Sequence, residues 1–242
     1  MSELVSARIR AHADRLGLAH LAETVEQLVS RAEADSMGYR DFLDLLLGEE
    51  VGVREGRRFR AALKLSGLPH HKTMDEFDFA FQPDLDVRKV RDLATLAFVT
   101  NRANVALLGP PGVGKTHLAV ALAVSACQAG HSIYFTTLDD CVRQLRAAEA
   151  AGRFAKKLQT YVRPAVLVLD EVGYVPCDRA AANMVFQLIS RRYERGSIVI
   201  SSNKAFSEWG GVFADDVLAT AILDRFLHHC DVVATSGTQS CN

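Results

Sequence analysis

The chain has 242 residues, of which 49% are hydrophobic and 24% are charged. This composition is typical of a folded globular protein with one large domain, or with one domain and a smaller appendage, and it excludes a mainly disordered or fibrous chain. Lysine and arginine number 28 against 29 acidic residues, which gives a formal net charge of −1. A uniformly polybasic protein is therefore excluded, and any contact with nucleic acid must come from local basic patches.

No membrane segment and no metal-binding cysteine motif is evident in the sequence. Apolar runs such as residues 165–169 are far shorter than the roughly 18 residues that a membrane span requires. Charged residues recur from the first positions onward, unlike in a secretory signal. We therefore expect a cytoplasmic protein without a membrane anchor. None of the cysteines forms a Cys-x-x-Cys pair, so we predict free thiols at Cys127, Cys141, Cys177, Cys230 and Cys241.

Residues 1–69 are predicted to form a small all-α N-terminal domain that binds DNA or a partner protein. Apolar residues there recur at intervals of three and four, as in Leu18, Leu21 and Val25, which is helical periodicity. A polar break at 35–38, which contains a glycine, is expected to separate two helices. Residues 70–100 are expected to form a linker that packs against its neighbour, followed by an entry helix.

From residue 101 onward, short apolar runs alternate with helix-length segments, and we place a second domain at 101–242. Runs this short and this apolar are typical of parallel strands that are buried on both faces. The predicted fold class is therefore α/β, with a five-stranded parallel sheet in a three-layer sandwich. The predicted strands are 105–108, 133–136, 166–169, 198–201 and 232–234.

The segment after the first of these strands matches the pattern G-x-x-x-x-G-K-[ST] and precedes a predicted helix at 117–129. Its glycines let several backbone N–H groups point at phosphate oxygens, and the helix adds the positive end of its dipole. Lys115 is predicted to reach the β and γ phosphates, and Thr116 to give its hydroxyl to Mg²⁺. The predicted nucleotide-binding residues are Gly109, Pro110, Pro111, Gly112, Val113, Gly114, Lys115 and Thr116.

Two carboxylates follow the apolar run at 166–169. Asp170 is predicted to hold the Mg²⁺ shell, and Glu171 to polarise a water molecule for in-line attack on the γ phosphate. Because successive strand residues point to opposite sides, the two acids need not share a task. The alternative is that they only begin a solvated loop. A glutamate in this place favours hydrolysis over transfer of the phosphoryl group to a metabolite.

Two further residues are candidates for catalysis. Asn203 follows the strand at 198–201, at the edge where parallel sheets place their ligand sites, and could hold the attacking water or contact the γ phosphate; a loop-capping role is the alternative. Arg225 lies among apolar residues of a predicted helix and could enter the nucleotide site of an adjacent subunit; the alternative is a surface pair with Asp224.

The histidine pairs at 70–71 and 228–229 have no cysteine or carboxylate partner at a suitable spacing, so we predict surface or core roles for them.

Two basic stretches are candidates for contact with a DNA phosphate backbone. Each contains a single glutamate among several cations, and a solvated helix face is the alternative for both. Because no base-reading motif accompanies them, binding would be independent of DNA sequence and sensitive to salt. The first stretch contains Arg54, Arg57, Arg58, Arg60 and Lys64, and the second contains Arg143, Arg146, Arg153, Lys156, Lys157 and Arg163.

Taken together, these residues resemble the IstB family, the ATPase helpers of insertion-sequence transposases, which are AAA+ proteins similar to the helicase loader DnaC. The resemblance extends from about residue 43 to residue 233. The stretches that carry it are 107–119, 170–174, 186–197 and 219–225. The last two separate this family from P-loop proteins at large.

The resemblance implies an AAA+ ATPase domain at 101–242, with the Walker A motif at 109–116, Walker B at Asp170 with Glu171, sensor I at Asn203 and a trans-acting arginine finger at Arg225. It also implies ATP and Mg²⁺ as cofactors, a homo-oligomer that depends on ATP, assembly on duplex DNA, and delivery of that DNA to a transposase.

One departure concerns the last residues. Where the family usually continues with Gly-x-Ser-Tyr-Arg, this chain has residues 237–242, GTQSCN, without the Tyr-Arg pair. If that arginine senses nucleotide, ATP hydrolysis is expected to be weak.

Other functions remain as alternatives to a transposition helper. A replicative helicase loader of the DnaC type would form a stable complex with a hexameric helicase. A small-molecule P-loop kinase would act as a monomer on a soluble acceptor, without stimulation by DNA. A DNA-binding scaffold that binds ATP without hydrolysing it is a weaker version of the favoured function.

Overall fold

The computed structural model describes residues 2–235, and the chain divides into two compact units between Ala61 and Ala62. The sequence places the end of the N-terminal domain later, at residue 69. Ser66 explains the difference, because it is buried in the second unit and its carbonyl accepts a hydrogen bond of 2.6 Å from the backbone N–H of Phe135. No helix of the described residues is long and apolar enough to cross a membrane.

The first unit is helical, as the periodicity predicts. Helix α1 (Ser2–Arg15) packs against α2 (Ala19–Ala34), and α3 (Tyr39–Leu65) begins after the predicted break at 35–38. The last turn of α3 lies beyond the division of the chain. The buried apolar side chains of this unit include Ala13, Val25 and Leu28.

A buried carboxylate and its arginine partner join α3 to α2 and to the turn between α1 and α2. Glu50 accepts hydrogen bonds from the N–H of Leu21 and from Arg54 Nε, both at 2.9 Å, and Arg54 also donates to the carbonyl of Gly17. Burial by itself raises the pKa of Glu50, but these donors outweigh it and leave the pKa below its usual value. Arg54 is therefore held by the fold of the first unit itself.

The second unit contains a five-stranded parallel sheet with the strand order β2-β3-β4-β1-β5, and all five predicted strands are confirmed. The strands are β1 (Asn104–Leu108), β2 (Ile133–Thr137), β3 (Val166–Val172), β4 (Ser197–Ser202) and β5 (Cys230–Ala234). The helices are η1 (Phe79–Phe81), α4 (Val87–Ala94), α5 (Ala97–Thr100), α6 (Lys115–Gln128), α7 (Leu138–Ala150), α8 (Phe154–Val162), α9 (Arg179–Arg192), η2 (Phe206–Glu208), α10 (Trp209–Val212) and α11 (Asp216–Leu227).

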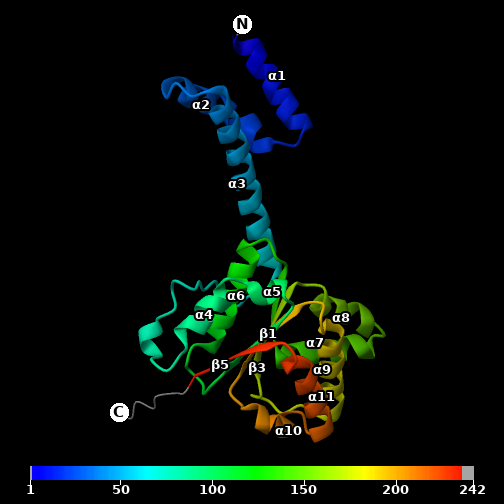
Figure 1. The fold of residues 1–242 in the computed structure, drawn as a ribbon. Helices are drawn as coiled ribbons and strands as arrows, with labels where there is room; N and C mark the ends of the chain where they lie inside the picture. The colour runs from blue at the N-terminus through cyan, green and yellow to red at the C-terminus, as the bar shows by residue number, and fades with distance from the viewer. Residues whose placement is uncertain (1, 236–242) are drawn as a thin grey trace. The chain divides into compact units, whose positions relative to one another are not determined.

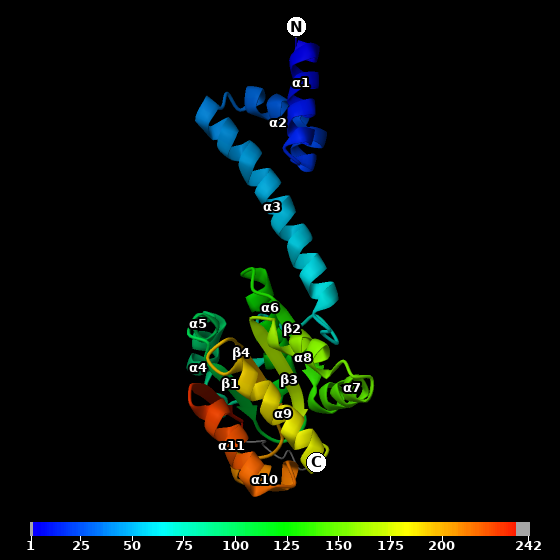
Figure 2. The same ribbon diagram turned by 90° about the vertical axis from the view of Figure 1, so that its right-hand side faces the viewer.

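Helices cover both faces of this sheet, which confirms the predicted three-layer arrangement. Figure 1 shows α4 and α6 on one side of the sheet and α7, α9 and α11 on the other, and Figure 2 gives the view at a right angle. Leu167 and Leu169 of β3 belong to the core beneath α7, α9 and α11, whereas Val166 and Val168 point to the opposite face and are equally buried. Since all strands are parallel, their carboxyl ends meet at one edge of the sheet.

At the opposite edge, a buried arginine holds the amino ends of β3 and β4. Arg192 is 1% exposed, and burial lowers its pKa to about 10, so it stays charged at neutral pH. Its terminal nitrogens donate to five backbone carbonyls at 2.7–3.2 Å, those of Tyr161, Val162, Pro164, Ala165 and Ser197. One side chain therefore joins the end of α8 to the starts of two central strands.

Replacing Arg192 with alanine is expected to lower the free energy of unfolding by at least about 3 kcal/mol, because several buried carbonyls lose their donor. The neighbouring Arg191 is exposed on the same helix, and Arg191→Ala should stay within about 0.5 kcal/mol of the wild type. Denaturant unfolding followed by circular dichroism measures both changes. Equal, small effects would mean that the Arg192 hydrogen bonds do not hold this edge of the sheet.

Candidate functional site

The loop at 109–114 leads from the end of β1 into α6, and its backbone geometry requires glycine at several positions. Gly109, Gly112 and Gly114 have φ angles of +154°, +85° and +87°. A Cβ atom on Gly109 would lie 2.1 Å from Thr235 Oγ1, and one on Gly114 would lie 2.8 Å from Phe77 Cε2. A side chain fits neither place, so the close approach of these neighbours depends on glycine.

Lys115 is the first residue of α6 and is 7% exposed. Its Nζ donates a hydrogen bond of 2.7 Å to the carbonyl of Pro110, within the same loop. Burial lowers the pKa of Lys115, and the nearby carboxylate of Asp170 acts in the opposite direction. A neutral acceptor thus holds the ammonium group of Lys115 at the loop. An anion bound at the same place would stabilise the charged form of this group.

A chain of hydrogen bonds connects α6 with the carboxyl ends of β3 and β4. Thr116 Oγ1 lies 3.1 and 3.0 Å from the two carboxylate oxygens of Asp170, which is 3% exposed. Ser201 Oγ donates to Asp170 Oδ1 and accepts a hydrogen bond of 3.0 Å from the N–H of Glu171. The structure therefore brings Thr116 and Asp170 together, as their predicted roles require.

The end of β3 contains a bulge that changes the direction of Glu171. The register between β3 and β4 shifts between Leu169 and Val172, and Glu171 has a φ of +60°. Such a bulge interrupts the alternation of a strand and re-aims a side chain. As a result, Asp170 is buried while Glu171 is exposed beside it.

These residues surround one pocket of about 270 Å³, to which the loop, β3 and β4 all contribute. The hydroxyl of Thr116 and the carboxylate of Asp170 are oxygen donors of the kind that Mg²⁺ prefers, and a Cβ on Gly112 would meet open space, so the residues fit a bound phosphate chain with its cation. The residues that line the pocket are Gly112, Gly114, Lys115, Thr116, Glu171, Tyr174 and Ser201.

A segment of the predicted linker packs against the start of α6. Phe77 is buried, and its ring lies edge-on to His117, with the ring centroids 5.2 Å apart. His117 Nε2 is hydrogen-bonded to the carbonyl of Thr73 at 3.1 Å. The linker is thus part of the wall around the loop at 109–114.

The two remaining catalytic candidates do not line this pocket. Asn203 follows β4 directly, and its buried Oδ1 has no hydrogen-bond partner among the described residues; it would lie 3.2 Å from a Cβ on Gly173. Arg225 of α11 places its guanidinium carbon 5.2 Å from the ring centroid of Phe186 in α9. Asn203 is therefore beside the loop that follows Glu171, whereas Arg225 is engaged elsewhere in its own chain.

The candidate DNA-binding residues fall into three settings. In the first stretch, Arg54 is bound within its unit, while the others are exposed along α3. In the second, Arg143 and Arg146 form ion pairs with Asp140 and Asp178. The remaining cations line a groove of about 940 Å³ between α7 and α8, none of whose lining residues is acidic. These cations are Arg153, Lys156, Lys157 and Arg163.

The structure adds site residues that the sequence did not single out. Ser201 connects the two carboxylate positions, Tyr174 lines the pocket, and Phe77 fits against Gly114. Ser201 could have been found from the sequence, because it has a hydroxyl and lies at the carboxyl end of a predicted parallel strand. The same rule pointed to Asn203. Nothing in the sequence indicates that Phe77 packs on the phosphate loop.

The fold and this site define a protein of the AAA+ P-loop class. The crystal structure of the DnaC helicase loader is similar to this chain with a TM-score of 0.54 and 20% identity, over 70% of this chain and 96% of that one. By its sequence, the chain belongs to the family of IstB-like ATP binding proteins, which it matches over residues 11–241.

Two relatives show how close this membership is. The chain is 44% identical over 230 residues to an ATP-binding protein of the insertion sequence IS5376 from Geobacillus stearothermophilus, which covers 95% of this chain and 92% of that protein. It is 48% identical over 223 residues to an ATP-binding protein of the insertion sequence IS21 from Pseudomonas aeruginosa, over 92% and 84% of the two chains. The departure from the family pattern at 237–242 lies outside the described residues.

Ser201→Ala is expected to lower the free energy of unfolding by about 1–3 kcal/mol, because the N–H of Glu171 and the carboxylate of Asp170 each lose a buried hydrogen bond. Ser207 is exposed nearby, and Ser207→Ala is the matched control. Thermal or denaturant unfolding of the two variants checks the difference. If Ser201→Ala is as stable as the control, Ser201 does not organise the site.

Proposed function

We propose that this protein is an ATP-dependent, DNA-binding helper for transposition, which assembles on duplex DNA in its ATP state, hydrolyses ATP and presents target DNA to a transposase. The observation that carries the proposal is the convergence of Lys115, Thr116 and Glu171 on one pocket beside the loop at 109–114, with Asp170 hydrogen-bonded to Thr116. The names of the relatives, which refer to insertion sequences, support transposition over helicase loading or small-molecule phosphorylation.

In this proposal the phosphate groups of ATP are bound by the backbone N–H groups of the loop and by Lys115. Thr116 and Asp170 hold Mg²⁺, which when bound neutralises part of the charge on the phosphates. The buried Lys115 gives its charge most effectively here, because little water competes with the anion.

Glu171 is proposed to orient and polarise the attacking water. The bulge at the end of β3 supports this role, because it turns Glu171 toward the pocket while Asp170 stays buried against Thr116 and Ser201. Asn203 is proposed to help position the water or the γ phosphate. Its buried Oδ1 has no hydrogen-bond partner among the described residues, which supports the proposal that Asn203 gains a new contact when nucleotide is bound.

Arg225 is proposed to act on the nucleotide of a neighbouring copy of the chain. It lies over Phe186 and not among the residues of its own pocket. An arginine outside its own site can stabilise the transition state only in trans, so the active, ATP-bound form is proposed to be a homo-oligomer.

Glu171→Gln is expected to reduce ATP turnover by about 10²-fold or more, because the amide cannot take a proton from water. Its ATP affinity should change little, since the groups that contact phosphate remain. Lys115→Ala should lose both binding and turnover. Phosphate release with and without duplex DNA, ATP binding, and particle size by light scattering, all in the same samples, measure these effects.

Each outcome of this experiment separates two functions. Wild-type turnover in Glu171→Gln would show that the assignment of Glu171 is wrong. ATP-dependent assembly without turnover in the wild type would favour a scaffold that does not hydrolyse ATP. A monomer at saturating ATP and DNA would contradict the trans role of Arg225. Phosphoryl transfer to a soluble acceptor, with no response to DNA, would favour a kinase.

The groove between α7 and α8 is proposed as a contact for the DNA backbone. The groove has four cations and no acidic residue in its lining, which concentrates positive charge on a chain whose net charge is −1. Small side chains at Ala147, Ala148 and Ala155 leave room between the helices. Such a surface neutralises phosphates without reading bases. The exposed cations of α3, at Arg57, Arg58, Arg60 and Lys64, are a second candidate surface.

Replacing Lys156 and Lys157 together with alanine is expected to weaken binding to duplex DNA of any sequence. Each lost phosphate contact should lower the slope of log K against log salt concentration by about 1. Fluorescence anisotropy at several salt concentrations measures the slope. The control is Arg88→Ala with Arg91→Ala, which removes two exposed charges from α4. An unchanged slope in the lysine variant, with a reduced slope for Arg57→Ala and Arg58→Ala, would assign the contact to α3.

A further inference from the structure

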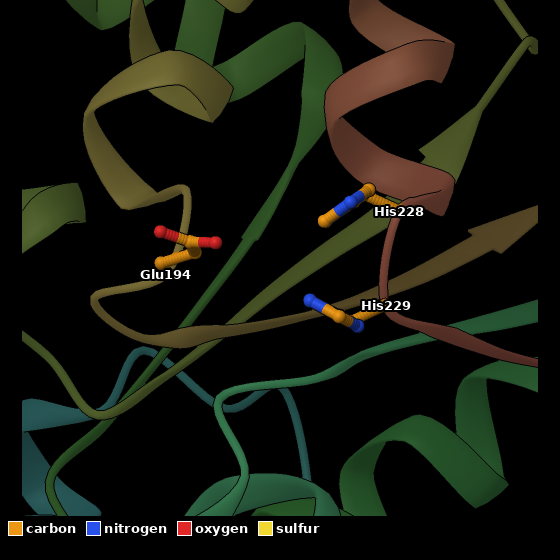
Figure 3. Close-up of side chains that lie close together, drawn as sticks. All are labelled: Glu194, His228 and His229. Atoms are coloured by element: carbon orange, nitrogen blue, oxygen red, sulfur yellow. The ribbon is translucent and has the colours of Figure 1, made fainter.

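A cluster of three potential metal ligands lies at the edge of the sheet that is opposite to the phosphate loop. Glu194 follows α9 in the loop that leads to β4, and His228 and His229 lie between α11 and β5. Figure 3 shows the three side chains facing one another. One ligand atom from each lies within 4.8 Å of the others, and all three residues are exposed. No carboxylate lies near His228 and His229 at a suitable spacing in the sequence, but the fold brings Glu194 beside them.

The backbone on both sides of this cluster is fixed by one neighbouring segment. Arg102 Nη1 donates a hydrogen bond of 2.9 Å to the carbonyl of Glu194. The N–H of Asn104 donates one of 2.7 Å to the carbonyl of His229. The backbone of two distant parts of the chain is therefore held in place before any ligand binds, while the side chains stay exposed.

The orientation of His228 also suits metal binding. The hydroxyl of Tyr193 is hydrogen-bonded to His228 Nδ1 at 3.0 Å. When His228 Nδ1 donates its proton to this hydroxyl, the contact fixes the ring and leaves Nε2 for the metal, as outer partners of metal-binding histidines do. The rings of His228 and His229 are adjacent, with centroids 4.2 Å apart, so their nitrogens can approach a single ion.

We propose that Glu194, His228 and His229 bind one divalent transition-metal ion, with Zn²⁺ as the best match. Two imidazoles and one carboxylate are suitable ligands for zinc, and a water molecule would complete the tetrahedral shell. Ligand atoms in such a shell lie about 3.3 Å apart, so the three side chains must close in slightly. Their exposure leaves them free to do so.

The bound ion would join the loop before β4 to the end of α11, the helix that contains Arg225. It would therefore add to the packing of α9 on α11 and to the Tyr193–His228 hydrogen bond, which already connect these two elements. This site does not depend on the proposed function, since none of its residues lines the nucleotide pocket.

The test is a zinc titration of the metal-free full chain without a polyhistidine tag, in competition with a chromophoric chelator. The wild type is expected to bind about one Zn²⁺ per chain at this site. His228→Ala with His229→Ala should weaken that binding by more than 10-fold, and Glu194→Gln, which keeps the size of the side chain, by about 10-fold or more. The matched control is His70→Ala with His71→Ala, which removes the other histidine pair and should leave the affinity unchanged.

Circular dichroism of each variant shows whether it is folded, and Glu194→Gln carries the test if the double histidine variant is not. No zinc binding by the wild type would overturn the proposal. Zinc binding that survives both Glu194→Gln and the loss of His228 and His229 would also overturn it, because the ion would then be bound elsewhere.

Discussion

The candidate site depends on one chain of hydrogen bonds, from Thr116 through Asp170 and Ser201 to the N–H of Glu171. It joins the start of α6 to the carboxyl ends of β3 and β4. The sheet makes this possible, because β4 lies between β3 and β1 and all three strands are parallel, so that their ends meet at one edge. Asp170 and Ser201 are buried and Thr116 is half-buried, so a missing partner would be costly at these three residues. The loop at 109–114 supplies room for an anion, but this chain of hydrogen bonds sets where the carboxylates lie beside that space.

The two edges of the sheet have different chemistry. At the carboxyl edge, the charged side chains of Lys115, Asp170 and Glu171 point into or beside an open pocket. At the amino edge, the guanidinium of Arg192 is enclosed by backbone carbonyls and reaches no ligand. Lys115 at one edge and Arg192 at the other are both buried charges, and burying a charge is costly. The hydrogen bonds of Arg192 offset that cost within the fold, whereas Lys115 has one neutral partner and a pKa below its usual value, a state that a bound anion would relieve.

The sequence predicted those features that depend on local pattern. The strands are short apolar runs, and the phosphate loop is a contiguous motif between a strand and a helix, so both could be placed within a few residues. The bulge at Glu171 could not be predicted, because it arises from a mismatch in register between β3 and β4. The same is true of Arg54, whose partner Gly17 is distant in the sequence, and of Glu194, which only the fold brings beside His228. In each case the missing information is a contact between remote segments.

Helix α7 lines the basic groove and also a second pocket that borders Glu171. It begins at Leu138, directly after β2, at the carboxyl edge of the sheet. There Asp139 and Val142 share a pocket of about 240 Å³ with Glu171 and Tyr174. Near its other end, Ala147 and Ala148 line the basic groove. A helix of 13 residues is a continuous hydrogen-bonded element, so no loop separates its residues near Glu171 from its residues in the groove. If binding of nucleotide and DNA is coupled within one chain, α7 therefore offers one physical connection between Glu171 and the groove.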